Sequence, residues 1–441
     1  MRLVLTPPTS LALSARDCAV LQAEGLLFNI LLQLVVMIAA ARAGNQLSCR
    51  LGQPGVIGEI FAGLLLGPSL FGHFFPGTSV ALFGASSAAP ITVISQIGVV
   101  LLMFQIGADF DFSLLKHPRN RNGAVVMAAV TTVVPWLLGF GIGQISAPVL
   151  APHADRFIYS LFCGISLAIM AVPVLGRILR EFDLAHTEIG VVAIAVAALN
   201  DVTGWVLLAG ISAYATATFS PRAVGMQLTG IVLLGAITWF VLRPLVSWLL
   251  EKMPIKRGEV GANALAAIVC LIFLMAMCTY ALGIFTMFGA FLSGLLFHAN
   301  RPFVDAWRAQ VGRFVLVFFL PVFFTYTGLR TNVLGLVGAS DWAWVTGIVL
   351  AAMLGKIVPG YIASRSCGFG HRECTIFGAL MNTRGLTELI VLNIGYDLGF
   401  IPRKVFTMLV IMAVVTTVMT GPLLRVLLPR AGYFRAQRVE A

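Results

Sequence analysis

The chain has 441 residues, of which 59% are hydrophobic and only 11% are charged. A soluble globular domain carries roughly 25% charged residues, so this composition excludes an ordinary water-soluble fold. In a soluble protein the net charge of +11 would suggest nucleic acid binding. Here the basic residues lie in short loops between apolar runs, which indicates a role in membrane topology, and no nucleic acid partner is expected.

Long apolar runs follow one another along the chain, each close to the about 20 residues that a helix needs to cross a bilayer. We expect an extracytoplasmic tail at 1–25, a transmembrane exchanger domain at 26–427 and a short cytoplasmic tail at 428–441. The predicted fold class is therefore an all-α integral membrane protein embedded in the lipid bilayer. Charges and Pro/Gly clusters divide the runs into about thirteen transmembrane helices, at about 26–42, 54–70, 91–108, 123–147, 157–176, 188–213, 226–250, 261–279, 284–298, 310–327, 342–364, 374–396 and 404–427.

The basic residues indicate how these helices are oriented. If the odd-numbered connections face the cytoplasm, that side holds 20 of the 29 basic residues and the other side holds seven. The remaining two, Lys356 and Arg384, lie inside spans. Because positive charge collects on the cytoplasmic side, we expect a multi-pass protein of the cell inner (plasma) membrane, with its N-terminus outside and its C-terminus in the cytoplasm.

Two pairs of segments resemble each other weakly. The stretch 58–66 (GEIFAGLLL) in the second span resembles 289–297 (GAFLSGLLF) in the ninth. Similarly, 104–107 (FQIG) closes the third span much as 325–328 (TYTG) closes the tenth. An offset of seven spans reverses a helix in the membrane, so this pattern predicts an inverted-topology repeat. Ordinary helix packing through small residues is the alternative explanation.

One carboxylate lies in the middle of an apolar span. Asp201 is flanked on both sides by apolar or small residues, and Asn200 precedes it. In a low dielectric a carboxylate must pair with a charge, bind a cation or take a proton. Binding a cation and taking a proton are alternatives at one site, which is the chemistry of cation/proton exchange. A carboxylate locked permanently to a basic partner is the competing interpretation, and Asn200 offers an amide oxygen or a hydrogen bond without charge.

Other ionisable residues also lie inside spans, where they are expensive and usually functional. Glu59 lies in the second span and Lys356 in the eleventh. Lys356 is the natural counter-charge for the buried acidic region, and we expect a static partner. A desolvated lysine is also readily deprotonated, so a second titrating group is the alternative.

Spans five and twelve look interrupted. Pro173 lies inside the fifth, where a proline frees backbone carbonyls. In the twelfth, Asn382 and Thr383 precede Arg384, with Glu388 one turn later. These spans are again seven apart, so we expect two discontinuous helices that cross near the midplane, with Arg384 and Glu388 balancing the dipoles of the half-helices. A simple proline kink would explain the fifth span alone.

Other classes of chemistry find little support in the sequence. The chain contains no GxxxxGK[ST] motif for nucleotide binding and no GxSxG or HExxH motif of a hydrolase. Its six histidines and seven cysteines show no metal-ligand spacing. We therefore expect no cofactor and no resident metal, and a transporter rather than an enzyme.

Five segments carry a family resemblance: 53–69 (QPGVIGEIFAGLLLGPS), 104–109 (FQIGAD), 200–205 (NDVTGW), 355–358 (GKIV) and 381–395 (MNTRGLTELIVLNIG). Together they resemble the monovalent cation/proton antiporter superfamily, in the branch of potassium-efflux systems and plant cation/proton exchangers. The resemblance implies a sodium/proton antiporter-like fold and a homodimer in which a mobile core moves against a scaffold. It also implies that Asp201 carries both the cation and the proton, with Asn200 beside it.

One residue departs from the family pattern. Relatives usually have threonine or serine in the break of span five, where this chain has Met170. A thioether is a poor ligand for a hard cation. The leading prediction is a secondary antiporter that exchanges K⁺ or Na⁺ for H⁺ by alternating access. A proton-coupled exporter of an organic compound on the same fold is the second, and a non-transporting membrane sensor the third.

Overall fold

The computed structural model describes residues 15–51, 53, 55–83, 85–109, 118–184, 187–216, 221–252, 258–282 and 286–431. Over these residues the chain is helical and contains no strand. The first half comprises α1 (Ala15–Arg50), α2 (Gly55–Leu66), α3 (Phe71–Phe74), α4 (Pro76–Phe83), α5 (Ala85–Asp109), α6 (Pro118–Leu150), α7 (Arg156–Ala168), α8 (Val172–Glu181) and α9 (Glu188–Thr216).

The second half begins with α10 (Pro221–Ile237), which continues through a π-helical turn, η2 (Thr238–Leu242), into α11 (Arg243–Lys252). The remaining elements are α12 (Ala262–Ala281), α13 (Thr286–Leu295), α14 (Arg301–Trp307), η3 (Arg308–Gly312), η4 (Val315–Phe319), α15 (Leu320–Arg330), η5 (Val333–Gly335), α16 (Ala339–Ser366), α17 (His371–Met381), α18 (Leu386–Asp397) and α19 (Arg403–Ala431).

Ten helical segments of the described chain are long and apolar enough to cross a membrane. They coincide with ten of the thirteen predicted spans. The other three predicted spans coincide with the short apolar helix α13 and with two interrupted helices, α7 with α8 and α17 with α18. The all-α membrane fold is thus confirmed, and the total of thirteen stays a prediction.

The predicted tails are only partly covered by the structure. Helix α1 begins at Ala15, inside the predicted N-terminal tail, and α19 continues to Ala431. Residues 1–14 and 432–441 lie outside the described residues, so the domain boundaries remain predictions.

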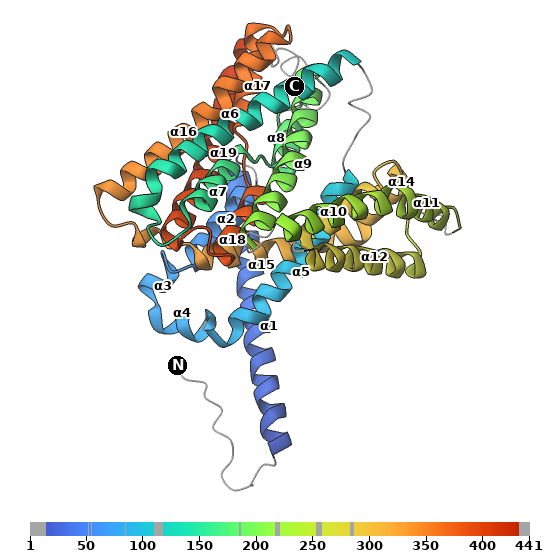
Figure 1. Ribbon diagram of the computed structural model, residues 1–441. Helices are drawn as coiled ribbons and strands as arrows, with labels where there is room; N and C mark the ends of the chain where they lie inside the picture. Colours follow the sequence, from blue (N-terminus) through green and yellow to red (C-terminus); the bar gives the residue numbers. More distant parts are fainter. Residues whose placement is uncertain are drawn as a thin grey trace, which may run out of the picture.

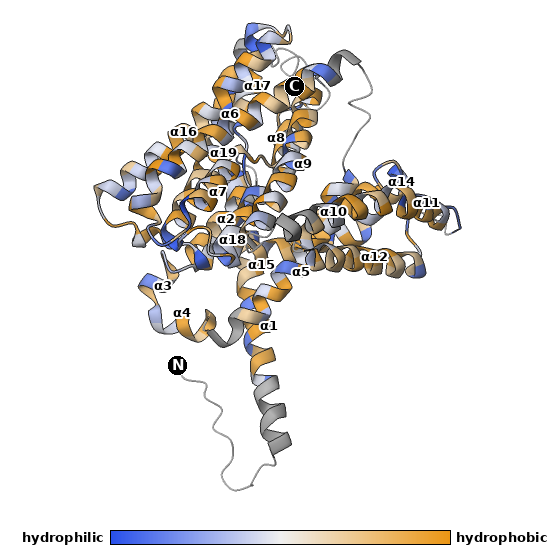
Figure 2. Cartoon of the chain, in the orientation of Figure 1, coloured by the Kyte–Doolittle hydropathy of each residue, from blue (hydrophilic) through white to orange (hydrophobic). Residues whose placement is uncertain are grey.

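Many residues on the outside of the helices are apolar, and Figure 2 shows α12 coloured as hydrophobic along most of its length. Phe240 is 75% exposed and Val232 71% exposed. Hydrocarbon tolerates such a surface, and helices satisfy their own backbone hydrogen bonds within it. The exposed side chains therefore fit a bilayer as the surrounding solvent.

The helices form two groups (Figure 1). In the core group, α6 packs on α7, α9 and α16, and α19 packs on α16, α17 and α18. This group contains both interrupted helices. In the support group, α2 packs on α1 and α15, and α13 packs on α5 and α12. In Figure 1 the core group occupies the upper left, α10 to α14 extend to the right, and α1 projects below.

Close glycine contacts support the inverted repeat. Gly63 of α2 lies against Gly328 of α15, because a Cβ added to Gly328 would overlap the backbone of Gly63. Gly294 of α13 touches α5 at Gly107 in the same way. In the sequence repeat Gly63 corresponds to Gly294, and Gly328 corresponds to Gly107. Glycines that correspond in the repeat thus make corresponding contacts between helices.

A third pair of contacts follows the same rule. A Cβ on Gly58 of α2 would overlap the backbone of Gly44 in α1, and a Cβ on Gly289 of α13 would overlap the backbone of Met275 in α12. Gly58 and Gly289 occupy equivalent places in the repeat. Random small-residue packing would not reproduce contacts between equivalent helices, so the repeat explains these glycines better.

Candidate functional site

The two interrupted helices cross each other at their breaks. Helix α7 ends at Ala168 and α8 begins at Val172, while α17 ends at Met381 and α18 begins at Leu386. A Cβ on Gly385 would lie 2.9 Å from the Val174 side chain and 3.9 Å from Cβ of Ala171. The break in span twelve therefore lies against the break in span five, which confirms the predicted crossing.

Local chemistry explains where each break falls. Pro173 lies in the first turn of α8, where its missing N–H has no helical acceptor to lose and its fixed φ suits a helix start. Gly385 has φ 146° and ψ −120°, a backbone conformation that residues with a Cβ rarely adopt. The proline thus starts α8, and the glycine allows the chain to turn from α17 into α18.

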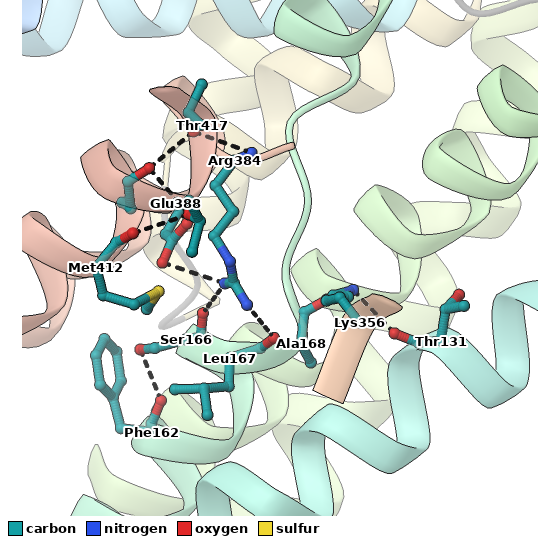
Figure 3. Close-up of polar contacts among 12 residues, drawn as sticks. Thr131, Phe162, Ser166, Leu167, Ala168, Lys356, Arg384, Glu388, Met412 and Thr417 are labelled. Atoms are coloured by element: carbon teal, nitrogen blue, oxygen red, sulfur yellow. Dashed lines mark hydrogen bonds and ion pairs between the residues drawn. The ribbon is translucent and has the colours of Figure 1, made fainter. Parts of the chain in front are cut away.

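Two basic side chains cap the end of α7 (Figure 3). The last four carbonyls of a helix lack helical partners, and here the first of them, Ile165, accepts from the backbone N–H of Ile169. Arg384 donates to the carbonyls of Ser166 and Leu167 at 2.8 and 2.7 Å. Lys356 of α16 donates to the carbonyl of Ala168. All four carbonyls are therefore satisfied, and both cations lie at the negative end of the α7 dipole.

Arg384 also forms a buried ion pair. Its guanidinium lies 3.2 Å from Oε1 of Glu388, and both side chains are 0% exposed. Glu388 lies in the first turn of α18, where the helix dipole favours a negative charge. The structure thus places Lys356 and Arg384 at the end of α7, with Glu388 paired to Arg384.

Asp201 and Asn200 lie near the middle of α9 and are 2% and 1% exposed. Neither carboxylate oxygen of Asp201 has a hydrogen-bond partner among the described residues. The groups that interact favourably with its negative charge are the backbone N–H of Val172, at the start of α8, and the Lys356 ammonium. Lys356 and Asp201 do not form an ion pair within 4.0 Å, so in this structure the lysine is bound to backbone carbonyls. Whether it is a static partner stays a prediction.

The side-chain amide of Asn200 is hydrogen-bonded to two threonines of α6, through its oxygen and through its nitrogen. The hydroxyl of Thr132 donates to its amide oxygen at 2.7 Å, and its amide nitrogen donates to the hydroxyl of Thr131 at 3.1 Å. Thr131 also accepts from Lys356 at its carbonyl, at 2.8 Å. These threonines were missed by the sequence reasoning. The available signal was a pair of hydroxyls inside an apolar span, three and four residues before Pro135.

The break residues themselves point to different neighbours. Met170 is 0% exposed and belongs to the buried apolar cluster of the core group. Its neighbour Ile169 packs on α9, where a Cβ on Gly204 would lie 2.6 Å from it. Asn382 donates to the carbonyl of Thr416 in α19 at 3.1 Å. Met170 is therefore in the segment that packs against α9, whereas the Asn382 amide is directed at α19.

Buried polar atoms without a partner gather around this crossing. Besides the Asp201 oxygens, they include the side-chain oxygen of Asn382, the hydroxyl of Thr383 and Oε2 of Glu388, considering the described residues only. Glu59 is bound elsewhere, because it accepts a hydrogen bond from Asn45 of α1 at 2.7 Å. Since buried polar groups are normally satisfied, this concentration makes the crossing the candidate site for ions or protons.

Comparison with known proteins agrees with this geometry. The family model described as "Sodium/hydrogen exchanger, transmembrane" matches residues 34–429. The Na⁺/H⁺ antiporter NhaS4 of Synechocystis is 35% identical over 400 residues, covering 90% of this chain and 96% of that protein. Cation/H⁺ antiporter 18 of Arabidopsis thaliana is 34% identical over 89% of this chain and 48% of its own length. The chain thus spans about half of that plant relative.

A solved structure shares the fold. The sodium proton antiporter MjNhaP1 from Methanocaldococcus jannaschii superimposes with a TM-score of 0.58 at 14% sequence identity, covering 90% of this chain and 96% of that one. With the crossing of two broken helices and the match of the family model over most of the chain, the conclusion is that this chain belongs to the sodium/hydrogen exchanger family.

Proposed function

We propose that this protein is a secondary active antiporter that exchanges Na⁺ or K⁺ for H⁺, with Asp201 as the shared carrier. The observation that carries the proposal is the Asp201 carboxylate, which is 2% exposed and has no hydrogen-bond partner in the described structure. A buried carboxylate is stable when protonated or when bound to a cation, and much less so when free. Since one species excludes the other, each turnover exchanges them.

The remaining ligands are expected from the backbone of the first break. The carbonyls of Ser166, Leu167 and Ala168 are occupied by Arg384 and Lys356. We therefore assign the cation to the Asp201 carboxylate together with the carbonyls of Ile169 and Met170, the next two along the chain. Hard cations prefer such oxygen ligands.

Other predicted site residues have supporting roles in this proposal. The Asn200 amide, bound at both ends by α6, orients the middle of α9. Lys356 and Arg384 hold the end of α7, and Glu388 balances Arg384. Pro173 and Gly385 determine where α8 and α18 begin, while Glu59 joins α1 to α2 through Asn45.

The larger arrangement follows from the same proposal. We assign the core group as the moving unit and the support group as the scaffold of a homodimer in the cell inner (plasma) membrane. The N-terminus is assigned to the outside and the C-terminus to the cytoplasm, on the distribution of basic residues. The protein is a transporter and not an enzyme, and it needs no cofactor.

A second candidate function is favoured by Met170. This side chain is fully buried in the break, where a hydroxyl would suit an alkali cation better. Methionine is an adaptable apolar contact, so proton-coupled export of an organic compound on the same fold is the competing function.

Transport in sealed vesicles tests the two functions. Inside-out vesicles carrying the protein would be acidified, and recovery of a quenched proton-gradient dye followed on adding Na⁺, K⁺ or Li⁺. We expect a saturable recovery with at least one of these ions and none in vesicles that lack the protein. Absence of recovery with every alkali ion, combined with recovery on addition of an organic cation, would support the second function instead.

A further inference from the structure

Lys356 reaches a carbonyl that an unbroken α-helix would not leave free. In a helix the carbonyl of residue 131 accepts from the N–H of residue 135. Residue 135 is a proline inside α6 and has no N–H. The Thr131 carbonyl instead accepts from the Lys356 ammonium at 2.8 Å. The proline thereby creates the acceptor that the lysine uses.

Pro135 also contacts the lysine's own helix. A Cβ on Gly355, the residue before Lys356, would lie 3.5 Å from Cβ of Pro135. The ring therefore lies beside α16 at the residue before Lys356. The carbonyl freed by Pro135 binds Lys356, and the proline ring lies beside Gly355, so both features of the proline involve neighbouring residues of α16.

The second proline of α6 shows the same pattern independently. Pro148 removes the N–H that would bond the carbonyl of Gln144. That carbonyl accepts from the guanidinium of Arg156 at 2.9 Å. Both helix-interior prolines of α6 thus free a carbonyl that a basic side chain then caps, one deep in the core and one at the exposed end.

We propose that Pro135 is a positioning residue for Lys356: by freeing the Thr131 carbonyl it holds the ammonium between α6 and the end of α7. Thr131 carries a second link, because its hydroxyl accepts from Asn200 at 3.1 Å and donates to Met127 at 2.7 Å. One residue of α6 thus connects the lysine of α16 to the residue beside Asp201. The charged groups that act on Lys356 are Asp201 of α9, Arg384 of the second break and Glu388 of α18.

Thermal melts in detergent test the bond directly, and do not depend on the proposed transport function. Lys356→Met leaves the carbonyls of Thr131 and Ala168 without the lysine and should lower the melting temperature. Adding Pro135→Ala restores an N–H that fills the Thr131 carbonyl, so the double variant should melt higher than Lys356→Met alone. In the wild-type background Pro135→Ala makes the new N–H compete with the lysine and should lower the melting temperature. A change of the same sign and size in both backgrounds would overturn the proposal.

The double variant keeps the test valid even if Pro135→Ala alone does not fold, because rescue is measured against Lys356→Met. Pro148→Ala is the matched control, since it changes the same helix and leaves Lys356 untouched. It should act equally in the wild-type and Lys356→Met backgrounds. Coupling of Pro148→Ala to Lys356 as strong as that of Pro135→Ala would also contradict the assignment.

A transport readout rests on the proposed function. A loosely held ammonium favours the ionised form of Asp201 less, so the proton competes better with the cation. Pro135→Ala should therefore move the half-maximal point of exchange to higher pH, by roughly one unit at most. Pro148→Ala should leave it unchanged. If neither variant transports any cation while the melts still show the rescue, the proposed function fails and the positioning role stands.

Discussion

The two interrupted helices share a backbone design but obtain their charges differently. The first break, Ile169 to Ala171, is apolar, and the groups that neutralise its helix ends come from other elements: Lys356 from α16, Arg384 from the second break and Asp201 from α9. The second break, Asn382 to Gly385, contains its own Arg384, and Glu388 follows within one turn.

This difference separates two tasks within one repeated fold. In the second break the opposite charges of Arg384 and Glu388 balance each other. A break whose charges belong to its neighbours leaves an Asp201 carboxylate without a hydrogen-bond partner in the described chain. That carboxylate is free to exchange ligands. The first break is accordingly the exchange site in our proposal, and the second break its support.

Removing the exchanging charge should have the largest effect. Asp201→Asn preserves the shape of the side chain but can neither titrate nor neutralise a cation, so we expect exchange to be abolished in proteoliposomes. Folding and membrane insertion should be retained, as measured by size-exclusion profile and yield. Glu188→Gln, at the exposed start of the same helix, is the control and should transport normally. Cation-evoked proton movement by Asp201→Asn would show that another group carries the proton.

Breaking the support should cost stability. Arg384→Met leaves Glu388 and the carbonyls of Ser166 and Leu167 without their donor, and loss of one partner from a buried pair costs about 3–5 kcal/mol. Thermal or denaturant unfolding in detergent measures this loss. Arg308→Met removes an exposed ion pair to Asp109, 45% and 32% exposed, and should cost about 1 kcal/mol or less. Equal losses in the two variants would mean that Arg384 is not the main support of the crossing.

The second break should also be sensitive to a change at Gly385, more so than the middle of α9. Gly385→Ala places a side chain at φ 146° and 2.9 Å from Val174, and such strain costs of order 1–3 kcal/mol. Gly210→Ala in α9 meets nothing within 4 Å and should be neutral or slightly stabilising. Unfolding of the two variants side by side measures the difference. A harmless Gly385→Ala would indicate that the chain can turn between α17 and α18 without this conformation.

The smallest effect is expected at Met170. If the substrate is an alkali cation, Met170→Thr adds a hydroxyl beside the exchange site and contributes on the order of 1 kcal/mol. This corresponds to a few-fold lower half-saturating concentration. Cation titrations of wild type and variant in proteoliposomes measure it, with Met170→Val as a control of similar shape without the hydroxyl. Equal or weaker affinity for every alkali ion would place residue 170 outside the cation shell and favour an organic substrate.

The sequence alone was enough for the class of fold and for the residues worth examining. Apolar runs of membrane length have few alternatives to helices, because hydrocarbon offers the backbone no hydrogen bonds. Charges inside such runs are too costly to be incidental. Asp201, Lys356, Arg384 and Glu388 therefore stand out by their positions in the sequence. The weak glycine repeat could also be recognised in the sequence, because helices in close contact accept only small residues there.

The partners of those charges were decided only by the tertiary structure. A lysine and an aspartate in one apolar domain suggest an ion pair, yet Lys356 bonds the carbonyls of Thr131 and Ala168. Both acceptors are backbone groups, freed by a proline in α6 and by the end of α7. Backbone acceptors are the same for every residue type, so the side-chain sequence does not reveal which carbonyl a distant lysine will reach. That choice depends on how α6, α7 and α16 cross, because packing of the whole core group sets the distances between them.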